Sequence, residues 1–178
     1  MRSLLKACAV LAMAVLAAPS AYAQLDSNQA QVQLNANLAE SLTVTAAPGA
    51  VNFALAAAGV APGSSQIGVT TTWVLNGGRT NVSLYAYFSS AVALTDGAGN
   101  NIPTSSVSGS VDGGGFSTFT GGAGPFGVNS VQMFSQAINN ANRNSSRAST
   151  LDLQIDTTGL NLPASTYTGV LNIQARAI

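Results

Sequence analysis

Ile67-Gly-Val-Thr-Thr-Thr-Trp-Val-Leu75, followed after a short link by Thr80-Asn-Val-Ser-Leu-Tyr-Ala-Tyr-Phe88, is the stretch that decides the fold. Apolar residues recur at every second position in both halves, so each half predicts a strand with one apolar face. Asn76-Gly77-Gly78 lies between them, and these residue types tolerate the positive φ that tight hairpin turns require. The stretch therefore predicts a β-hairpin, with Trp73 in the middle of the core.

Alternating or short apolar runs recur along the rest of the chain. They predict further strands at 29–38, 41–45, 51–55, 91–94, 102–111, 131–134, 151–155 and 170–178. A polar loop is predicted at 139–149. Turn residues separate the strands, no segment shows sustained helical periodicity, and nothing repeats at a fixed period. The pattern predicts an all-β protein, a single Ig-like or Greek-key antiparallel sandwich of about eight to ten strands.

The first 23 residues have the layout of a secretory signal peptide. Two positive charges precede an apolar run at 7–18, and Ala21-Tyr22-Ala23 forms a small-residue cleavage site. The apolar run is shorter than the roughly 20 residues that a membrane span needs, so no transmembrane span is expected. We expect an exported domain at 24–178 that resides in the periplasm, at the cell surface or outside the cell.

Charge is scarce in the expected mature chain, which carries four arginines, no lysine and six acidic residues, a net charge of −2. Nucleic-acid binding needs clustered positive charge, so that function is excluded. Low net charge weakens the repulsion between copies and is common in proteins that self-associate. The only cysteine, Cys8, lies within the signal peptide, so the mature protein has none with which to form a disulfide.

Catalytic residue types are missing from the mature chain, which has no histidine, cysteine or lysine. This excludes Ser-His-Asp, Cys-His and Ser-Lys nucleophile systems, and zinc sites built on His or Cys. Asp152 and Asp156 are about 13 Å apart along a strand, whereas glycosidase carboxylates lie roughly 5 to 9.5 Å apart. We therefore expect a protein that is not an enzyme and uses no cofactor.

One loop, Asp96-Gly-Ala-Gly-Asn100, has oxygen atoms of the kind that calcium prefers. Its spacing differs from that of the EF-hand loop. A β-turn in which Asp96 caps its own backbone is the favoured interpretation. No metal site is therefore predicted.

Aromatic residues are the candidates for partner contact. The glycine-rich stretch 112–127 contains Phe116, Phe119 and Phe126, which either meet a partner or fold back onto the core. Tyr85 and Tyr87 lie on the face of their strand opposite Leu84 and Ala86. A module that binds cell-wall glycan would use these aromatic side chains.

The segment 32–38, near the mature N-terminus, is the candidate for assembly. Val32, Leu34, Ala36 and Leu38 share one face of a strand, and the residues between them are Gln or Asn. One interpretation is the first, half-buried strand of its own sandwich. The other is a strand that pairs with the open sheet edge of a neighbouring subunit or another surface protein.

Two stretches resemble known families. Leu162-Pro-Ala-Ser-Thr-Tyr167-Thr-Gly-Val-Leu-Asn-Ile173 is similar to the ending of spore-coat-U-like and chaperone–usher-pilin-like secreted sandwiches. Tyr167 there resembles a tyrosine corner, whose hydroxyl bonds to backbone a few residues upstream. The chain departs from usher pilins in having no disulfide.

The second resemblance is to WxL surface domains, which bind the cell wall. It rests on Leu42-Thr-Val-Thr45 with Pro48 and Phe53, followed by Trp73-Val-Leu75, and the second Trp-x-Leu of that family is missing. Both resemblances imply a bacterial surface or matrix protein. We expect a structural subunit of the pilus, coat or matrix kind, with a carbohydrate-binding adhesion module as the alternative.

Overall fold

The computed structural model describes residues 27–120 and 125–178. An N-terminal unit ends at Asn37, and a compact unit extends from Leu38 to Ile178. The predicted signal peptide, residues 1–23, lies outside the described residues. The compact unit contains eleven described strands and a single 3-10 turn, which confirms the all-β prediction.

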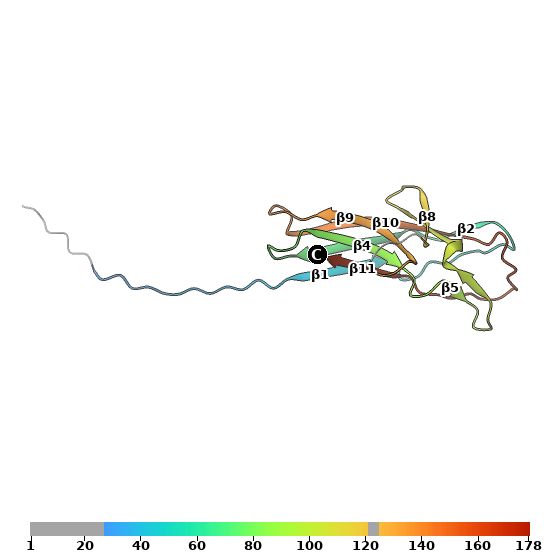
Figure 1. The fold of residues 1–178 in the computed structure, drawn as a ribbon, viewed down its shortest axis with the longest axis horizontal. Helices are drawn as coiled ribbons and strands as arrows, with labels where there is room; N and C mark the ends of the chain where they lie inside the picture. The colour runs from blue at the N-terminus through green and yellow to red at the C-terminus, as the bar shows by residue number, and fades with distance from the viewer. Residues whose placement is uncertain (1–26, 121–124) are drawn as a thin grey trace, which may run out of the picture. The chain divides into compact units, whose positions relative to one another are not determined.

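The larger sheet of the compact unit has six antiparallel strands (Figure 1). They are β1 (Ser41–Ala47), β2 (Val60–Pro62), β3 (Ile67–Val74), β7 (Val107–Val111), β8 (Phe116–Thr118) and β10 (Asn144–Asp156). The order across the sheet is β1-β3-β10-β7-β8, and β2 pairs separately with β10. The outermost strands of this sheet are therefore β1 and β8.

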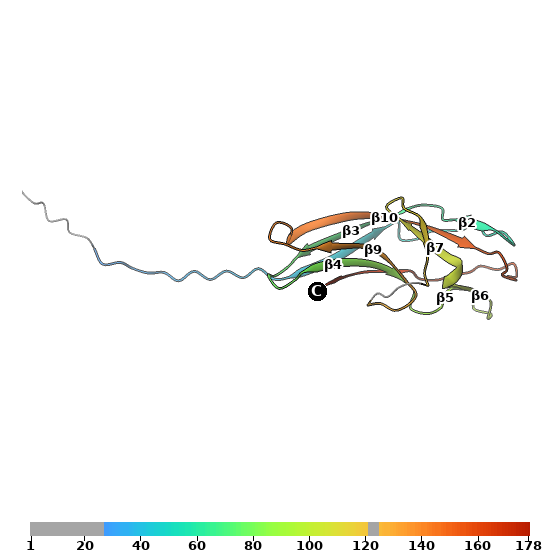
Figure 2. The same ribbon diagram turned by 45° about the horizontal axis from the view of Figure 1, so that its top comes forward.

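The second sheet has three antiparallel strands in the order β11-β4-β9. Their bounds are β4 (Asn81–Tyr87), β9 (Ser130–Ala137) and β11 (Asn172–Ala177). A separate pair is formed by β5 (Val92–Thr95) and β6 (Asn101–Pro103), followed by the 3-10 turn Thr104–Ser106. Figure 2 shows β3 and β10 in one layer and β4 and β9 in the other, the arrangement of a β-sandwich.

The core lies between the two sheets. The apolar residues of β3 and β4 alternate with outward-facing residues, and the inward row of β4 is 0% exposed. Trp73 is 2% exposed, and its indole N–H donates a 2.8 Å hydrogen bond to the carbonyl oxygen of Asn142. This bond satisfies the one polar group of the Trp73 side chain.

The predicted hairpin at 67–88 is wrong, although both of its strands are present. β3 pairs with β1 and β10, whereas β4 pairs with β11 and β9 in the other sheet. The link between them crosses from one sheet to the other, and neither Gly77 nor Gly78 has a positive φ. Alternation specifies which face of a strand is buried, and it is satisfied equally by two strands that face each other across a core.

The prediction of a half-buried strand at 29–38 is also wrong. No residue from 27 to 40 belongs to a strand, and all of them are exposed. The first strand begins at Ser41 instead and pairs with β3. Within the described residues, the segment with this alternating pattern therefore pairs with no strand.

Other boundaries differ in smaller ways. The polar loop predicted at 139–149 becomes strand from Asn144 onward, because β10 continues along β3 with polar residues on its outer face. The strand predicted at 102–111 is divided into β6 and β7 by the turn at 104–106. Within 51–55 only Phe53 forms a bridge, to Gly63.

Candidate functional site

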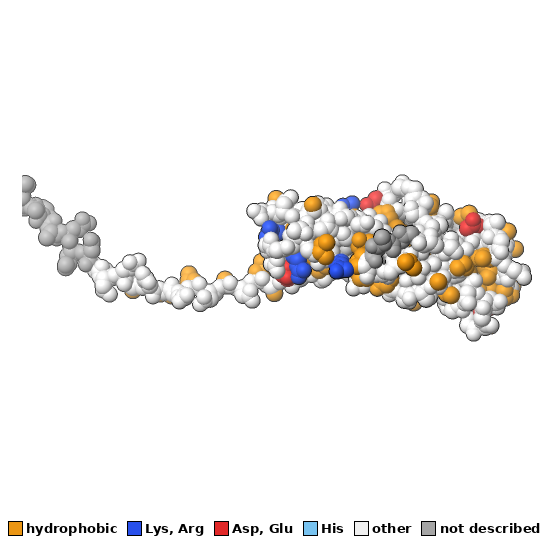
Figure 3. All heavy atoms as spheres, viewed as in Figure 1, with side chains coloured by type: hydrophobic (Ala, Val, Ile, Leu, Met, Phe, Trp, Pro, Cys, Tyr) orange, Lys and Arg blue, Asp and Glu red, His pale blue; other side chains and the backbone are white. Residues whose placement is uncertain are grey.

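The alternating segment, residues 32–38, displays its apolar face to solvent. Val32, Leu34 and Leu38 are 82%, 88% and 80% exposed, and Ala36 is exposed as well. Figure 3 shows apolar side chains standing separately along this part of the chain. Full burial of each large apolar side chain would contribute about 1.5–3 kcal/mol, so this face has a strong tendency to find a partner.

β1 and β11 lie beside one another at one border of the sandwich (Figure 1). Each is the outermost strand of its own sheet, and no strand pairing joins the two. An outermost strand presents a row of backbone N–H and C=O groups that lack a strand partner. We call this border the β1–β11 seam.

Apolar side chains at the β1–β11 seam are only partly covered. Leu42 and Val44 of β1, together with Ile173, Ala175 and Ala177 of β11, pack against the core but remain half-buried. The smaller sheet has three strands, whereas the path across the larger sheet has five. These half-buried side chains therefore lie where the cover over the core is incomplete.

The opposite border of the sandwich is closed by Phe119, which follows β8. Phe119 is 0% exposed, and its ring lies so close to Gly109 that an added Cβ there would approach it to 3.4 Å. The sequence left open whether this side chain meets a partner or folds back, and the structure places it in the core. Phe119 is therefore not available for partner contact in this structure.

Glu40 fixes the chain immediately before β1. Its carboxylate accepts a 2.8 Å hydrogen bond from the backbone N–H of Asn76 and pairs with the Arg79 guanidinium at 3.2 Å. The hydrogen bond from Arg79, followed by that from Asn76, holds the pKa of Glu40 below its usual range. Both partners belong to the β3–β4 link, so these bonds hold residue 40 against one end of the sandwich. We call this arrangement the Glu40 clamp.

Tyr85 and Tyr87 lie on the outer face of β4, and the structure brings Phe126 to them. The Phe126 ring stacks on Tyr87 with centroids 5.0 Å apart and meets Tyr85 edge-on at 5.6 Å. The Tyr87 hydroxyl donates a 3.0 Å hydrogen bond to Oε1 of Gln174 on β11. All three rings are half-buried, which leaves part of this aromatic cluster open to solvent.

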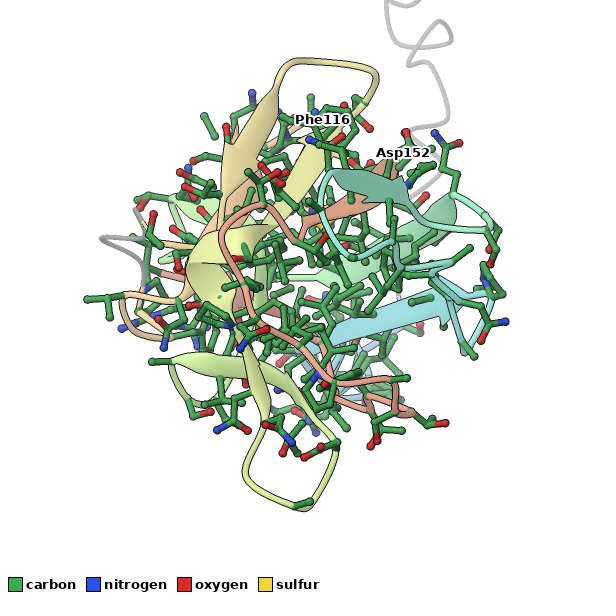
Figure 4. All side chains as sticks on the ribbon, turned by 90° about the vertical axis from the view of Figure 1, so that its right-hand side faces the viewer. Phe116 and Asp152 are labelled. Atoms are coloured by element: carbon green, nitrogen blue, oxygen red, sulfur yellow. The ribbon has the colours of Figure 1, made fainter. Side chains whose placement is uncertain are left out.

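Phe116 lies apart from the aromatic cluster, on the outer face of the other sheet. Its side chain is 50% exposed. Strand register places Phe116 beside Ser110, and Ser110 beside Asp152 (Figure 4). The contact residues predicted from the sequence therefore do not form one surface.

A hollow of about 340 Å³ lies beside Trp73. Its lining residues are Trp73, Gln136, Asn142, Ser145, Ser146 and Arg147. Arg147 is engaged elsewhere: its guanidinium carbon lies 4.5 Å from the centroid of the Phe134 ring, and a terminal nitrogen lies 3.7 Å from an Asp112 oxygen. None of these lining residues carries a carboxylate. The hollow therefore contains no carboxylate that could act as a general acid or base.

The carboxylates from Glu40 onward have structural partners. Within 27–120 and 125–178, no group of three or more His, Cys, Asp or Glu residues could hold a metal ion. Asp96 accepts backbone hydrogen bonds from Ala98 at 2.8 Å and Asn100 at 3.0 Å, which confirms the turn interpretation of this loop. Its pKa lies below the usual range, chiefly because the Asn100 side chain donates to it. Asp152 accepts from Gln66, and Asp156 from the backbone of Thr158.

Tyr167 lies in the turn that leads to β11. Its hydroxyl donates a 3.0 Å hydrogen bond to the carbonyl oxygen of Pro163, four residues upstream. This is the bond of a tyrosine corner. The neighbouring Thr168 forms two backbone hydrogen bonds of 2.9 Å with Thr95, so this turn is attached to the β5–β6 pair.

No protein-family model and no curated protein matches this chain. Among the described residues, no helix is long and apolar enough to cross a membrane. The two family resemblances noted in the sequence remain expectations. The features that bear on function are the alternating segment, the β1–β11 seam and the aromatic cluster.

Proposed function

We propose that this protein is a non-enzymatic structural subunit of the bacterial cell exterior, exported by its signal peptide, that assembles with copies of itself by strand addition. The observation that carries this proposal is the exposed alternating segment. Its apolar residues occupy every second position, which is the period of a strand with one buried face. A sheet edge in another molecule would bury that face and pair its backbone.

The composition of the chain supports assembly. Residues 27–39 contain no charged side chain, so no charge must be desolvated when the alternating segment is buried. The mature chain has a net charge of only −2, which weakens the repulsion between copies. The lack of histidine, cysteine and lysine in the mature chain supports a structural role over a catalytic one.

The test is the mass of the mature protein, residues 24–178, by light scattering across a concentration series. We expect large species whose share rises with concentration. A variant that combines Val32→Asn and Leu34→Asn should remain monomeric, because it removes two apolar side chains from the buried face. A control variant that combines Gln31→Asn and Gln33→Asn changes the other face and should assemble like the wild type. A wild-type protein that is monomeric at every concentration would contradict the proposal.

A second candidate function is glycan binding by the aromatic cluster. Tyr85, Tyr87 and Phe126 offer ring surface beside the amide of Gln174, and binding sites commonly combine aromatic rings with a few placed polar groups. A pull-down on purified peptidoglycan tests it. Replacement of Tyr85 and Tyr87 by Ala should abolish retention, whereas Phe116→Ala, on the other sheet, should not. Equal retention of all variants would contradict this candidate.

A further inference from the structure

We propose that the hollow beside Trp73 is a binding site for an acidic sugar, whose carboxylate pairs with the guanidinium of Arg147. This site is separate from the aromatic cluster, because the two share no residue. It is also independent of assembly through the alternating segment. The volume of about 340 Å³ lies at the lower end of the range for small-molecule sites, which suits a ligand of the size of a single sugar.

The hollow lies at the border where β9 and β10 run along the sandwich (Figure 1). β7 pairs with Leu151–Ile155 of β10, so the earlier part of that strand, from Asn144 to Ser149, is paired only with β3. β9 is itself an outermost strand of the smaller sheet. Among the described strands, none therefore covers the space between the sheets at this end.

Strand register gathers polar side chains on the inner face of the larger sheet at this end. Ser145 lies opposite Trp73, and Arg147 lies opposite Thr71. Trp73 and Thr71 belong to the buried row of β3, so their partners on β10 face inward as well. Gln136 of β9 lines the same hollow from the other sheet. The hollow therefore lies between the two sheets and has a mostly polar lining.

The guanidinium of Arg147 is held in position, but its hydrogen-bond donors are not satisfied. Its carbon lies 4.5 Å from the centroid of the Phe134 ring, and a terminal nitrogen lies 3.7 Å from an oxygen of Asp112. Neither contact is a hydrogen bond, and the Arg147 side chain makes none with the residues that the structure describes. A guanidinium has five N–H donors in a planar fork that matches a carboxylate. These donors therefore favour a ligand that carries a carboxylate.

Two buried hydroxyl groups beside Arg147 are a second, independent indication of a polar ligand. Oγ1 of Thr71 and Oγ of Ser149 have no hydrogen-bond partner among the described residues. Thr71 is 0% exposed and Ser149 is 2% exposed, and Ser149 lies two positions from Arg147 on the inward face of β10. Buried hydroxyls without a partner are costly, and native proteins usually supply one. A bound ligand and its ordered waters would supply these partners.

The residue types of the lining favour an acidic sugar over a simple anion. Arg147 offers a positive charge, Ser145 a hydroxyl group and Gln136 an amide, while Trp73 offers an aromatic surface. A uronate has the matching groups, because it combines one carboxylate with several hydroxyl groups and an apolar C–H surface. A simple anion would leave the hydroxyl, amide and aromatic groups without a role in binding.

Trp73 provides the readout for the test, because it lines the hollow and is the only tryptophan of the chain. The mature protein, residues 24–178, is titrated with sodium glucuronate and with sodium galacturonate while its tryptophan fluorescence is followed. We expect a saturable change with at least one of the two. Glucose and galactose lack the carboxylate, and acetate lacks the sugar ring, so these three should give no saturable change.

Variants locate the binding. Arg147→Gln should weaken uronate binding about tenfold or more, because it removes the charged fork. Arg147→Lys keeps the charge without the fork and should weaken binding as well. Arg176→Gln removes a charge from β11, outside the lining, and is the matched control that should bind like the wild type. Replacement of Tyr85 and Tyr87 by Ala should also leave uronate binding unchanged, which separates this site from the aromatic cluster.

Asp112→Asn tests the pairing by a gain in affinity, which damage to the fold does not produce. Asparagine can still accept the 2.7 Å hydrogen bond from the backbone N–H of Thr150, and it tolerates the positive φ of this position. It removes the carboxylate that competes for Arg147, so uronate binding should tighten by about two- to fivefold.

Three results would overturn the proposal. The first is a wild-type protein that responds to neither uronate, or that responds equally to the neutral sugars or to acetate. The second is an Arg147→Gln protein that binds a uronate as tightly as the wild type does. The third is an Asp112→Asn protein whose affinity does not rise.

Discussion

The ring of Phe119 packs edge to face against the ring of Phe88, with centroids 5.0 Å apart and an interplanar angle of 70°. Because Phe119 is completely buried, Phe119→Ala leaves a cavity that its neighbours fill only in part. We expect the free energy of unfolding to fall by about 3–5 kcal/mol. Urea unfolding followed by the fluorescence of Trp73 measures this loss.

Phe116 provides the comparison within the same glycine-rich stretch. It is 50% exposed, so Phe116→Ala should lower the free energy of unfolding by about 1 kcal/mol or less. Equal losses for the two variants would show that Phe119 does not close the border of the sandwich in solution.

The second prediction concerns the bond from Tyr167 to Pro163. Tyr167→Phe keeps the ring and removes the hydroxyl, which donates to the Pro163 carbonyl. The net contribution of such a bond is about 0.5–1.5 kcal/mol, so the urea midpoint should fall modestly. Removal of the hydroxyl of Tyr85, which has no hydrogen bond to any of the residues that the structure describes, should leave the midpoint unchanged. A midpoint that is the same in both variants would show that the Tyr167 bond contributes nothing.

The strands of the core were predictable because their information is local. The alternation of 67–75 and 80–88 specifies two strands and their buried faces, and both are found. It carries no information about which strand pairs with which, so the turn residues Asn76 to Gly78 suggested a hairpin where the chain crosses between sheets. Pairing between distant strands depends on packing throughout the core, so a short stretch of sequence does not determine it.

For the candidate functional site too, the sequence predicted local structure but not which parts of the chain come together. The pattern of 32–38 is that of a strand, and the sequence alone favoured the first strand of its own sandwich over a strand that pairs with another molecule. The β1–β11 seam was not predictable, because it depends on which strand ends each sheet and on how the two sheets are stacked. The meeting of Phe126 with Tyr85 and Tyr87 likewise depends on how a long loop returns to the second sheet.

The third prediction concerns pH. The pKa of Glu40 is lowered in the folded protein by the hydrogen bonds from Arg79 and Asn76, relative to an ordinary value of 4.5. A lowered folded-state pKa means that the charged form stabilises the fold above the unfolded-state pKa. That contribution is lost as pH falls through the lowered value. We expect stability to decrease on acidification below about pH 4.5.

Glu40→Gln isolates the part of this pH dependence that is due to the Glu40 clamp. Glutamine can still accept a hydrogen bond but does not titrate, so the variant should lose less stability than the wild type between neutral and acidic pH. Asp96 and Asp156 also have lowered pKa values, so the variant should keep part of the dependence of stability on pH. Urea midpoints across a pH series measure the difference. Identical pH profiles would show that the clamp is not formed in solution.

The last prediction concerns Gly169, which lies between the Tyr167 corner and β11. A Cβ added at this position would overlap the carbonyl oxygen of Ala93, a backbone atom that cannot move aside as a flexible side chain can. Gly169→Ala should therefore separate the turn from β5 and lower the free energy of unfolding by about 1–3 kcal/mol. Gly115 has open space around it and no positive φ, so Gly115→Ala should be neutral or stabilise by up to about 1 kcal/mol. Urea unfolding of the two variants makes the comparison, and a Gly169→Ala protein as stable as Gly115→Ala would show that the turn and β5 are not in contact.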